Sequence, residues 1–504
     1  MPNDIQTSGP TTGQATLRPD FETAVLAPIR AIVGDRGLIT DAETMKPFME
    51  SWRDGWVGRS PAVVLPDSTE ALAAVVRICA ETRTPIVPQG GNTGLTGASQ
   101  PHADGSEIVI STNRLNRIRE IDIDNDTMTV EAGCILANIQ SAARDVGRLF
   151  PMSLAAEGSC QIGGNIATNA GGVQVVRYGN MRNLVAGLEV VLPDGRIWDG
   201  LRGLRKDNAG YDLKQIFIGS EGTLGIVTAA VLKLSPLPRA TATALVAVSA
   251  PSDAVDLLTR AKGVAGDRIV TFELIQRACI DVARRHVPDV PDPLRDRYPW
   301  YVLVELADQD SGNRLAEMLE GILEAGMEAG EVLDGVVAAS KAQADSLWRI
   351  REGIPEGQKR EGVSFKHDVS VPISRVARFL DRTDAALERA CPGIRPFSFG
   401  HLGDGNIHYN PIQAEDGDPA EWRAKLATVN AIVHDIVVDL GGSISAEHGI
   451  GRLRIDEMPR YKSPVELEMM ATLKRAFDPH NLMNPGKILH SSEVAPEVTS
   501  KVAP

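Results

Sequence analysis

Short apolar runs alternate with stretches of helical spacing along the first hundred residues. Residues 62–65 form an apolar run that predicts a buried strand, and Asp67 is the candidate N-cap of a following helix. We expect this helix to reach about Arg83, because apolar residues recur on one face at Leu72, Val75, Val76 and Cys79. A second strand, 85–88, leads into the glycine-rich residues 89–97. This order of elements places bare backbone amides beside a ligand.

The same patterns predict alternating strands and helices over the rest of the chain. Further strands are expected at 107–110, 118–123, 127–131, 188–192, 229–234, 244–248, 301–306 and 365–371. Further helices are expected at 135–146, 253–261, 314–324, 342–351, 373–389, 421–440 and 464–476. The proline-rich residues 235–238 mark the clearest boundary, since the glycine-rich loops stop there. The expected parts are a disordered tail 1–20, domains 21–238 and 239–450, a helical segment 451–490, and a tail 491–504.

Length and charge restrict the class of protein. A chain of 504 residues is too long for a single core, so two or three domains are expected. The formal net charge of −14 argues against a nucleic-acid partner, although a local Arg/Lys pocket could still bind an anionic substrate. The 5 cysteines are scattered, which argues against an iron–sulfur cluster and fits reduced thiols in the cytoplasm. No apolar run approaches the roughly 20 residues that span a bilayer, so we expect a soluble cytoplasmic protein.

Two histidines and a distant carboxylate form the most informative group of polar residues. His401 and His408 are expected to lie in one glycine-rich turn, and Glu447 is followed directly by His448. Two imidazole nitrogens and one carboxylate oxygen suit a divalent metal such as zinc, with a position left open for substrate. His448 would then be available for proton transfer. The same ligands could activate water in a zinc hydrolase, so the residue types alone leave the reaction open.

Three glycine-rich segments precede the proline-rich boundary. They span residues 89–97, 158–172 and 219–227, and none has the GxGxxG or GxxxxGK[ST] spacing of the common nucleotide-binding loops. Each segment alone is compatible with a tight connection between elements. Three such segments in one domain indicate a large extended cofactor that approaches the backbone at several points.

These motifs resemble those of a flavoprotein superfamily. Residues 88–94, 163–172 and 219–227 are similar to the FAD-binding domain of the vanillyl-alcohol oxidase/p-cresol methylhydroxylase superfamily. Residues 401–408, 445–449 and 484–487 resemble the branch of FAD-linked D-2-hydroxyacid dehydrogenases, which includes D-2-hydroxyglutarate and D-lactate dehydrogenases. The resemblance runs in order over about residues 30–490. It implies an α+β protein: a two-subdomain FAD-binding domain of p-cresol methylhydroxylase type, an α+β substrate (cap) domain with an antiparallel sheet, and a C-terminal helical segment that returns to the flavin domain.

The resemblance implies non-covalent FAD. Some superfamily members attach the flavin to a histidine in the first glycine-rich loop, whereas this chain has Asn92 and Thr93 there. The pyrophosphate would lie on the first segment, and the third segment would approach the flavin end. The implied cofactor-binding residues are Pro88, Gln89, Gly90, Gly91, Asn92, Thr93, Gly94, Gly158, Gly163, Gly164, Asn165, Thr168, Gly171, Gly172, Glu221, Gly225, Ile226, Val227, Asn484 and Lys487.

The resemblance also implies roles at the substrate site. The metal ligands, for Zn²⁺ or another divalent metal, would be His401, His408 and Glu447. His448 would be the catalytic base and would contact the substrate, and Asn410 would bind the 2-hydroxy carboxylate. The distal carboxylate of a substrate such as 2-hydroxyglutarate would be held by Arg351 and Lys366. Pro355 stands where a hydroxylated residue is expected, which leaves the preferred side chain of the substrate open.

The favoured function is oxidation of D-2-hydroxyglutarate to 2-oxoglutarate, with proton abstraction by His448 and hydride transfer to the flavin. The alternatives are a D-lactate or glycolate dehydrogenase, the zinc hydrolase, and a non-catalytic flavoprotein subunit. The expected partners are the small-molecule substrate and an electron acceptor such as electron-transfer flavoprotein or a quinone. A homodimer is also compatible with the resemblance, and neither nucleic acid nor a transmembrane segment is expected.

Overall fold

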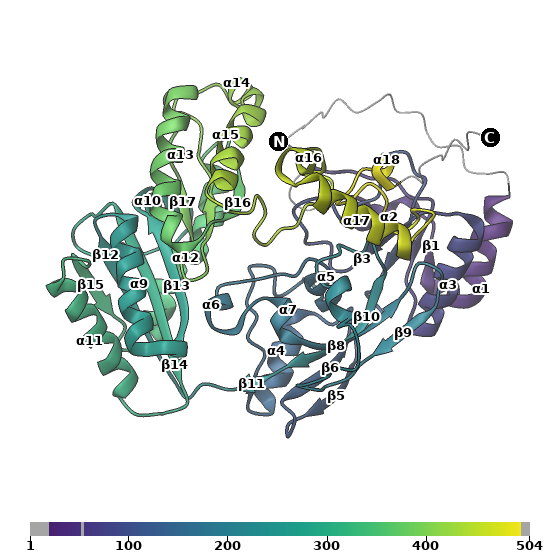
Figure 1. Cartoon of the computed structure of the whole chain (residues 1–504), viewed down its shortest axis with the longest axis horizontal. Coiled ribbons are helices and arrows are strands. Elements are labelled where there is room, and N and C mark those ends of the chain that lie inside the picture. Colours follow the sequence, from purple (N-terminus) through teal and green to yellow (C-terminus); the bar gives the residue numbers. More distant parts are fainter. Residues whose placement is uncertain (1–19, 52–54, 495–504) are drawn as a thin grey trace, which may run out of the picture.

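The computed structural model describes residues 20–51 and 55–494, which build three larger β-sheets with their covering helices and a two-stranded sheet of β7 and β11 (Figure 1). The first sheet has the strand order β1-β2-β4-β3, with β1 antiparallel to β2 and the other pairs parallel. Helix α3 connects β2 to β3, as the apolar spacing predicts. The bounds are β1 (Leu38–Ile39), β2 (Val63–Val64), α3 (Thr69–Thr82), β3 (Ile86–Gln89) and β4 (Ile108–Ser111).

Helices cover both faces of the first sheet. Val64, Ile108 and Ile110 pack against α1 and α3, whereas Val63 and Val109 face α2. Helices α1 (Ala27–Val33) and α2 (Ala42–Met49) both precede α3 in the sequence. This alternation is the period of two that a strand imposes when both of its faces are buried.

The start of α3 differs from the prediction. Ser68, not Asp67, is the N-cap: its hydroxyl accepts a hydrogen bond from the backbone N–H of Ala71 at 3.2 Å. Asp67 instead accepts a hydrogen bond from Arg114 at 3.0 Å. Asp and Ser are both good N-cap residues, and the extended backbone of Ser68 makes it the N-cap here.

The second sheet is antiparallel throughout and has the order β5-β6-β10-β8-β9. Its core contains Val130, Leu188 and Ala230 together with the helices that follow β6. The bounds are β5 (Ile118–Asp122), β6 (Thr127–Glu131), α4 (Leu136–Asp145), β7 (Arg148–Leu149), α5 (Ile162–Ala167), α6 (Val175–Tyr178), α7 (Met181–Leu184), β8 (Val185–Val191), β9 (Ile197–Gly200), α8 (Lys214–Phe217), β10 (Ile226–Lys233) and β11 (Ser235–Pro236). The predicted strand 127–131 is confirmed residue for residue.

The third sheet carries the polar motifs and is also antiparallel, in the order β15-β12-β14-β13-β17-β18-β16. Its strands are β12 (Ala240–Val248), β13 (Ile269–Gln276), β14 (Trp300–Asp308), β15 (Asp334–Val337), β16 (His367–Ser370), β17 (Ser398–His401) and β18 (Asn406–Tyr409). Its helices are α9 (Pro251–Ala265), α10 (Arg277–His286), α11 (Arg314–Glu328), α12 (Lys341–Arg360), α13 (Val376–Ala390), α14 (Pro419–Ala424) and α15 (Leu426–Asp439).

Two helical layers enclose this sheet. Ala244 and Val246 of β12 belong to the core with α9, α11, α13 and α15, whereas Leu245 and Ala247 belong to the core with α10 and α12. Strand β13 was not predicted from the sequence, although it is the centre of the sheet. Helix α12 continues past Arg351 through Pro355, and the predicted helix 421–440 is two helices separated at Lys425.

The C-terminal segment returns to the first sheet, where α16 and α17 lie near β3 and α2 in Figure 1. The backbones of Leu482 and Asn484 form hydrogen bonds of 2.7 Å with Ile86 of β3, so this segment adds an isolated parallel bridge at the edge of the sheet. The helices are α16 (Met458–Tyr461), α17 (Pro464–Phe477) and α18 (Ser491–Val494). Most of the predicted tail 1–20, and residues 495–504 of the other tail, lie outside the described residues.

Helices that could span a membrane are absent from residues 20–51 and 55–494. The 5 cysteines also lie within these residues, where all of them are buried and none forms a disulfide bond.

One buried lysine attaches α17 to the rest of the molecule. Lys474 donates hydrogen bonds to the backbone oxygens of Thr223 at 2.8 Å and Met483 at 2.7 Å, and pairs with Asp478 at 2.5 Å. We expect Lys474→Met to lower the free energy of unfolding by about 3 kcal/mol, because Asp478 is left as a buried, unpaired charge. The measurement is the midpoint of thermal or denaturant unfolding.

Lys462→Met is the matched control. Lys462 pairs with Glu466 across the same four-residue spacing at 3.1 Å, but both side chains are over two-fifths exposed. Its loss should change stability by less than about 1 kcal/mol. Equal midpoints for the two variants would contradict the anchoring role of Lys474.

Candidate functional site

A β-hairpin positions the two histidines of the polar motif. His401 ends β17 and His408 lies within β18, so both stand on paired strands and not in the connecting turn. The turn needs Gly405, which has a φ of +86° and whose Cβ would lie 2.3 Å from the backbone oxygen of Val371. The hairpin therefore fixes both imidazoles on a rigid element, with ring centroids 5.4 Å apart.

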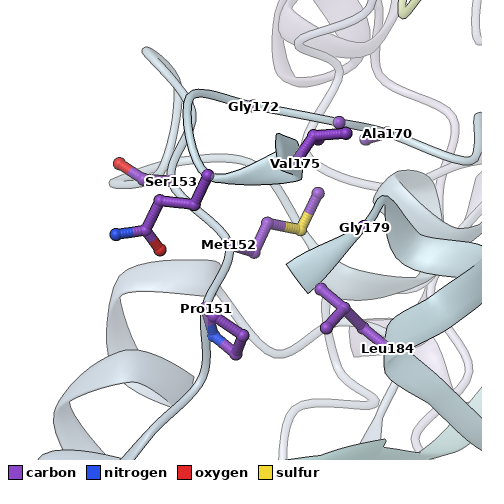
Figure 2. Close-up of a pocket in the computed structure, with 10 residues that line it drawn as sticks. Pro151, Met152, Ser153, Ala170, Gly172, Val175, Gly179 and Leu184 are labelled. Atoms are coloured by element: carbon purple, nitrogen blue, oxygen red, sulfur yellow. The ribbon is translucent and has the colours of Figure 1, made fainter. Parts of the chain in front are cut away.

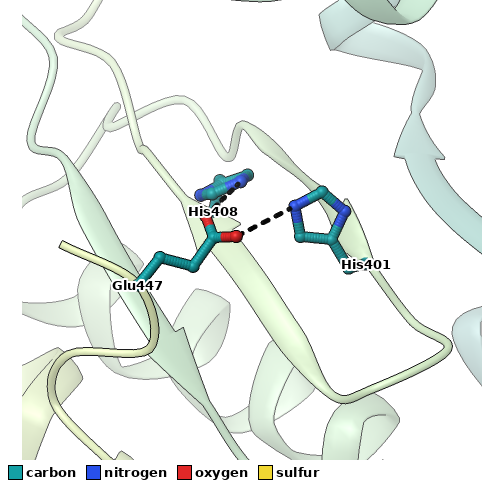
Figure 3. Close-up of side chains that lie close together, drawn as sticks. All are labelled: His401, His408 and Glu447. Carbon is teal, nitrogen blue, oxygen red and sulfur yellow. Dashed lines mark ion pairs between the residues drawn. The ribbon is translucent and has the colours of Figure 1, made fainter. Parts of the chain in front are cut away.

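Glu447 approaches this hairpin from a separate segment and lies between the two rings (Figure 3). Nε2 of His401 is 3.7 Å from Oε1 of Glu447, and Nε2 of His408 is 4.0 Å from Oε2. One ligand atom from each of the three residues lies within 4.8 Å of the others. The structure thus brings together the three side chains that the sequence analysis assigned to a metal.

Two buried carboxylates that sequence reasoning missed stand behind the histidines. Glu273 of β13 forms a very short hydrogen bond with Nδ1 of His401, and an oxygen of Asp368 lies 3.7 Å from Nδ1 of His408. Each histidine therefore has a carboxylate on the side of the ring that faces away from Glu447. The sequence held a signal for Glu273, since it is the single charge in β13 and must find a partner when it is buried.

Charge pairing sets the pKa values around the hairpin. Burial by itself raises the pKa of Glu273, but the charges of His401 and Arg351 outweigh it and bring the pKa down to about 2. Burial lowers the pKa of His401, yet Glu273 raises it to about 9. Burial and the neighbouring charge of His401 lower the pKa of His408 to about 3, whereas a cation bound at His401 would have to displace one of the two ring protons that its raised pKa retains.

Asp368 organises the segment that carries Glu447 and His448. One of its oxygens accepts hydrogen bonds from the backbone N–H groups of Glu447 at 2.8 Å and His448 at 2.9 Å, and the other accepts from Asn406 at 2.9 Å. Nδ1 of His448 is 3.6 Å from the same carboxylate. Although burial raises the pKa of Asp368, the charges of His448 and His408 and these hydrogen bonds hold it well below its usual range. Asp368, Glu447 and His448 form a second possible group of cation ligands.

The residues predicted to bind the substrate differ in their burial and in their hydrogen-bond partners. Arg351 is buried, stacks over the ring of Phe399 at 4.7 Å, and donates from Nε to Glu273 at 2.6 Å. Asn410 is also buried, but its side-chain amide donates to Gln358 at 3.2 Å and accepts from the backbone of His367 at 2.9 Å. Lys366 is largely exposed just before β16. Arg351 is thus joined directly to the histidine network through Glu273.

A polar cavity of about 170 Å³ adjoins Glu447. Asn169, Gly171 and Asn180 line one side of it, and Asp404, Asn406 and Glu447 line the other. The side-chain oxygens of Asn180 and Asn406 are buried and accept no hydrogen bond from the described residues. Burial raises the pKa of Asp404 to about 6. A cavity with unsatisfied polar groups is suited to a small polar ligand.

A smaller pocket lies on the other side of residues 170–175 (Figure 2). Pro151, Met152 and Leu184 form its apolar wall, and its volume is about 10 Å³. That volume admits about one water molecule, so the pocket is not a substrate site.

The glycine-rich segments meet one another closely. A Cβ on Gly91 would lie 2.2 Å from the oxygen of Ser159, and one on Gly172 would lie 2.1 Å from the oxygen of Ser153. By contrast, a Cβ on Gly94, Gly158 or Gly164 would meet no atom within 4 Å. The first kind of glycine permits close packing of backbone, and the second leaves backbone open to a ligand.

Several residues predicted to bind the cofactor have side chains that hydrogen-bond within the loops. The side-chain amide groups of Gln89 and Asn92 donate to backbone oxygens, and Thr168 donates to the oxygen of Gly164. Both carboxylate oxygens of Glu221 accept backbone N–H groups at 2.7 Å. Lys487 pairs with Glu107 at 3.2 Å, and both side chains are fully buried.

The remaining predicted positions leave polar atoms and backbone available. The side-chain oxygens of Asn165 and Asn484 are buried and accept no hydrogen bond among the described residues. Asn484 donates to the oxygens of Ala98 and Glu221, so the C-terminal segment joins the first and third glycine-rich segments. Burial lowers the pKa of Lys487 to about 8. Open glycine backbone and unsatisfied amide oxygens at the junction of the segments fit an extended cofactor such as FAD.

Known families match both halves of the chain. Residues 60–200 match the FAD binding domain, which covers the first two glycine-rich segments, and residues 237–488 match the C-terminal domain of FAD linked oxidases. FAD is therefore the cofactor.

Known sequences and structures agree with these family matches. The probable mitochondrial D-2-hydroxyglutarate dehydrogenase of Oryza sativa subsp. indica is 39% identical over 465 residues, which is 92% of this chain and 81% of the relative. The D-2-hydroxyglutarate dehydrogenase of a Xanthomonas citri strain is 39% identical over 90% of this chain and 95% of the relative. A crystal structure of p-cresol methylhydroxylase with substrate bound has a TM-score of 0.72 at 18% identity, over 95% of this chain and 99% of that chain. This fold confirms the expected α+β class of p-cresol methylhydroxylase type, and the chain belongs to the family of FAD-linked oxidases.

Proposed function

We propose that this protein is an FAD- and metal-dependent dehydrogenase that oxidises D-2-hydroxyglutarate to 2-oxoglutarate. The names of its relatives support the substrate class. The observation that carries the proposal is the arrangement of His401, His408 and Glu447, in which each imidazole has Nε2 towards Glu447 and Nδ1 towards a buried carboxylate.

The donor set fits a divalent metal. Two ligand atoms of a tetrahedral zinc site lie roughly 3.4 Å apart, close to the 3.7 and 4.0 Å that separate the imidazole nitrogens from Glu447. A carboxylate behind a coordinating histidine fixes its ring and tautomer, the role that Glu273 and Asp368 would have here. When bound, the metal would make the substrate hydroxyl more acidic and hold the adjacent carboxylate.

His448 is the proposed base. Its ring lies parallel to that of His408, with an interplanar angle of 15° and centroids 6.4 Å apart, so it stands beside the proposed metal ligands. Asp368 would hold the proton on Nδ1, which leaves the lone pair of Nε2 free to take the hydroxyl proton. FAD supplies the acceptor for the hydride.

Arg351 is the proposed ligand of the distal carboxylate. Its Nε is occupied by Glu273, and this contact with the stacking on Phe399 holds the guanidinium in one orientation. The terminal nitrogens make no further hydrogen bond within the described residues, so they remain as paired donors for a carboxylate. Lys366 and Asn410 are proposed to assist, and Pro355 keeps D-lactate as the second candidate substrate.

Anaerobic reduction of the flavin tests the function. D-2-Hydroxyglutarate should bleach the flavin absorbance, with a kcat/KM at least about 100-fold above that of D-lactate, which lacks the distal anion that Arg351 binds. The same margin is expected over L-2-hydroxyglutarate, because inversion at C2 exchanges the hydroxyl and the hydrogen and so moves the reacting C–H bond away from the flavin. A higher value for D-lactate would move the assignment to the second candidate. No bleaching by any 2-hydroxy acid would leave a non-catalytic flavoprotein subunit.

Loss of a metal ligand should separate metal binding from flavin binding. In His401→Ala we expect the zinc content to fall and flavin reduction to slow by at least about 100-fold, while the flavin absorbance per protein is unchanged. His490→Ala is the control, since His490 pairs with the exposed Asp456 at 3.1 Å. Full activity in thoroughly demetallated protein would refute the metal role.

Removing the base should leave both cofactors in place. We expect His448→Ala to slow flavin reduction by about 100- to 10,000-fold while zinc and FAD are retained, because only the proton acceptor is lost. Rapid mixing with D-2-hydroxyglutarate under anaerobic conditions measures the rate. A near-normal rate would remove His448 from this role.

A further inference from the structure

The segment 446–453 carries Glu447 and His448 and is held from two sides. From the side of the seven-stranded sheet, Asp368 accepts the backbone N–H groups of Ala446, Glu447 and His448. The other side belongs to the glycine-rich segments, which lie more than 200 positions earlier in the chain. The position of Glu447 and His448 therefore depends on both parts of the molecule.

Glu221 of the third glycine-rich segment makes the central contact on the flavin side. Its two carboxylate oxygens accept the backbone N–H groups of Ile450 and Gly451, each at 2.7 Å. Thr96 of the first segment adds to this contact: its backbone oxygen accepts from Arg452 at 2.9 Å and Leu453 at 3.1 Å. Five consecutive residues, 449–453, thus pack against two of the three cofactor loops.

The contact leaves little space for movement. Gly449 and Gly451 both have positive φ, and a Cβ on them would lie 2.6 Å from the carboxylate of Glu221 and 2.3 Å from the oxygen of Thr96. A shift of Glu221 must therefore be transmitted to the turn that follows His448.

Glu221 is itself fixed by the cofactor loops. Its backbone N–H donates to the oxygen of Ala167 in the second segment at 2.7 Å, and its backbone oxygen accepts from Asn484 at 2.8 Å. Its φ of 50° is a left-handed conformation that a non-glycine residue adopts at a cost of about 1–2 kcal/mol. Burial raises the pKa of its carboxyl to about 7, against the opposing effect of the two N–H groups. A buried acid in a strained conformation at this junction is difficult to explain by packing alone.

We propose that Glu221 is a positioning residue that couples the flavin-binding loops to the 446–453 segment. When FAD orders the glycine-rich segments, Glu221 and Thr96 hold Glu447 and His448 in place. The functional consequence rests on the roles proposed above for those two residues. Because coupling between sites is reciprocal, a metal bound through Glu447 also strengthens FAD binding by the same factor.

Glu221→Gln is the test variant. The shape of the side chain is retained, but its NH₂ group faces one of the two backbone N–H groups, which loses its acceptor. In the FAD-loaded protein, amide hydrogen exchange of the peptide covering 446–453 should become about 10-fold faster than in the wild type. Flavin absorbance per protein, measured at saturating FAD, shows that the variant is loaded, and the zinc affinity, measured with a chelating dye, should fall by about 10-fold.

Glu361→Gln is the matched control. Glu361 has a similarly buried carboxylate and pairs with Arg285, Arg395 and His286, none of which belongs to the 446–453 segment. Exchange of the 446–453 peptide should be unaffected in this variant. Unchanged exchange in Glu221→Gln, or equally fast exchange in both variants, would overturn the proposal.

The wild type gives an independent measurement in case the variant does not fold. Removal of FAD should speed exchange of the 446–453 peptide by about 10-fold relative to a peptide of α13, and equal protection with and without FAD would overturn the proposal. Hydrogen exchange does not depend on the reaction. If no 2-hydroxy acid reduces the flavin of the wild type but its exchange still depends on FAD, the proposed function is refuted. The proposed coupling would stand in that case.

Discussion

Burial of two carboxylates beneath the β17–β18 hairpin is the constraint on which the candidate site depends. Taking Glu273 and Asp368 out of water costs several kcal/mol for each charge unless partners replace the lost hydration. The partners are those side chains and backbone amides that define the site: His401 and Arg351 around Glu273, and His408, His448 and two consecutive N–H groups around Asp368. The contacts that compensate these two buried charges are therefore also the contacts that fix the geometry of the site.

The seven-stranded sheet makes this burial possible. Helices cover both of its faces, so water is excluded from β13, β16, β17 and β18. A charge buried on these strands without a partner would be strongly destabilising. Arg351 reaches these strands from α12, and Glu447 reaches them from a segment with no regular structure. The irregular segment needs external support, which Asp368 gives on one side and Glu221 and Thr96 give on the other.

The glycine-rich segments also stabilise the site. The polar side chains of Gln89, Asn92 and Thr168 bind neighbouring backbone, and open glycines present bare backbone where a ligand can approach. The sequence resemblance assigns these residues to the cofactor, and this stays a prediction because a motif shows which residues recur but not which atoms they contact. In this chain they stabilise the loops, and the loops in turn stabilise the segment of Glu447 and His448.

The sequence by itself determined the local elements and the types of chemistry. Apolar spacing placed α3, α4, β6 and α17 within a few residues, and the histidine motif with Glu447 identified a possible metal site. It did not identify β13, the cap at Ser68, or the roles of Glu273, Asp368 and Glu221. The roles of these three carboxylates depend on contacts between residues 128, 80 and 229 positions apart. Periodicity and caps act over a few residues, whereas the partner of a buried charge is fixed only when distant strands pack, and so the tertiary structure alone decided how the site is held.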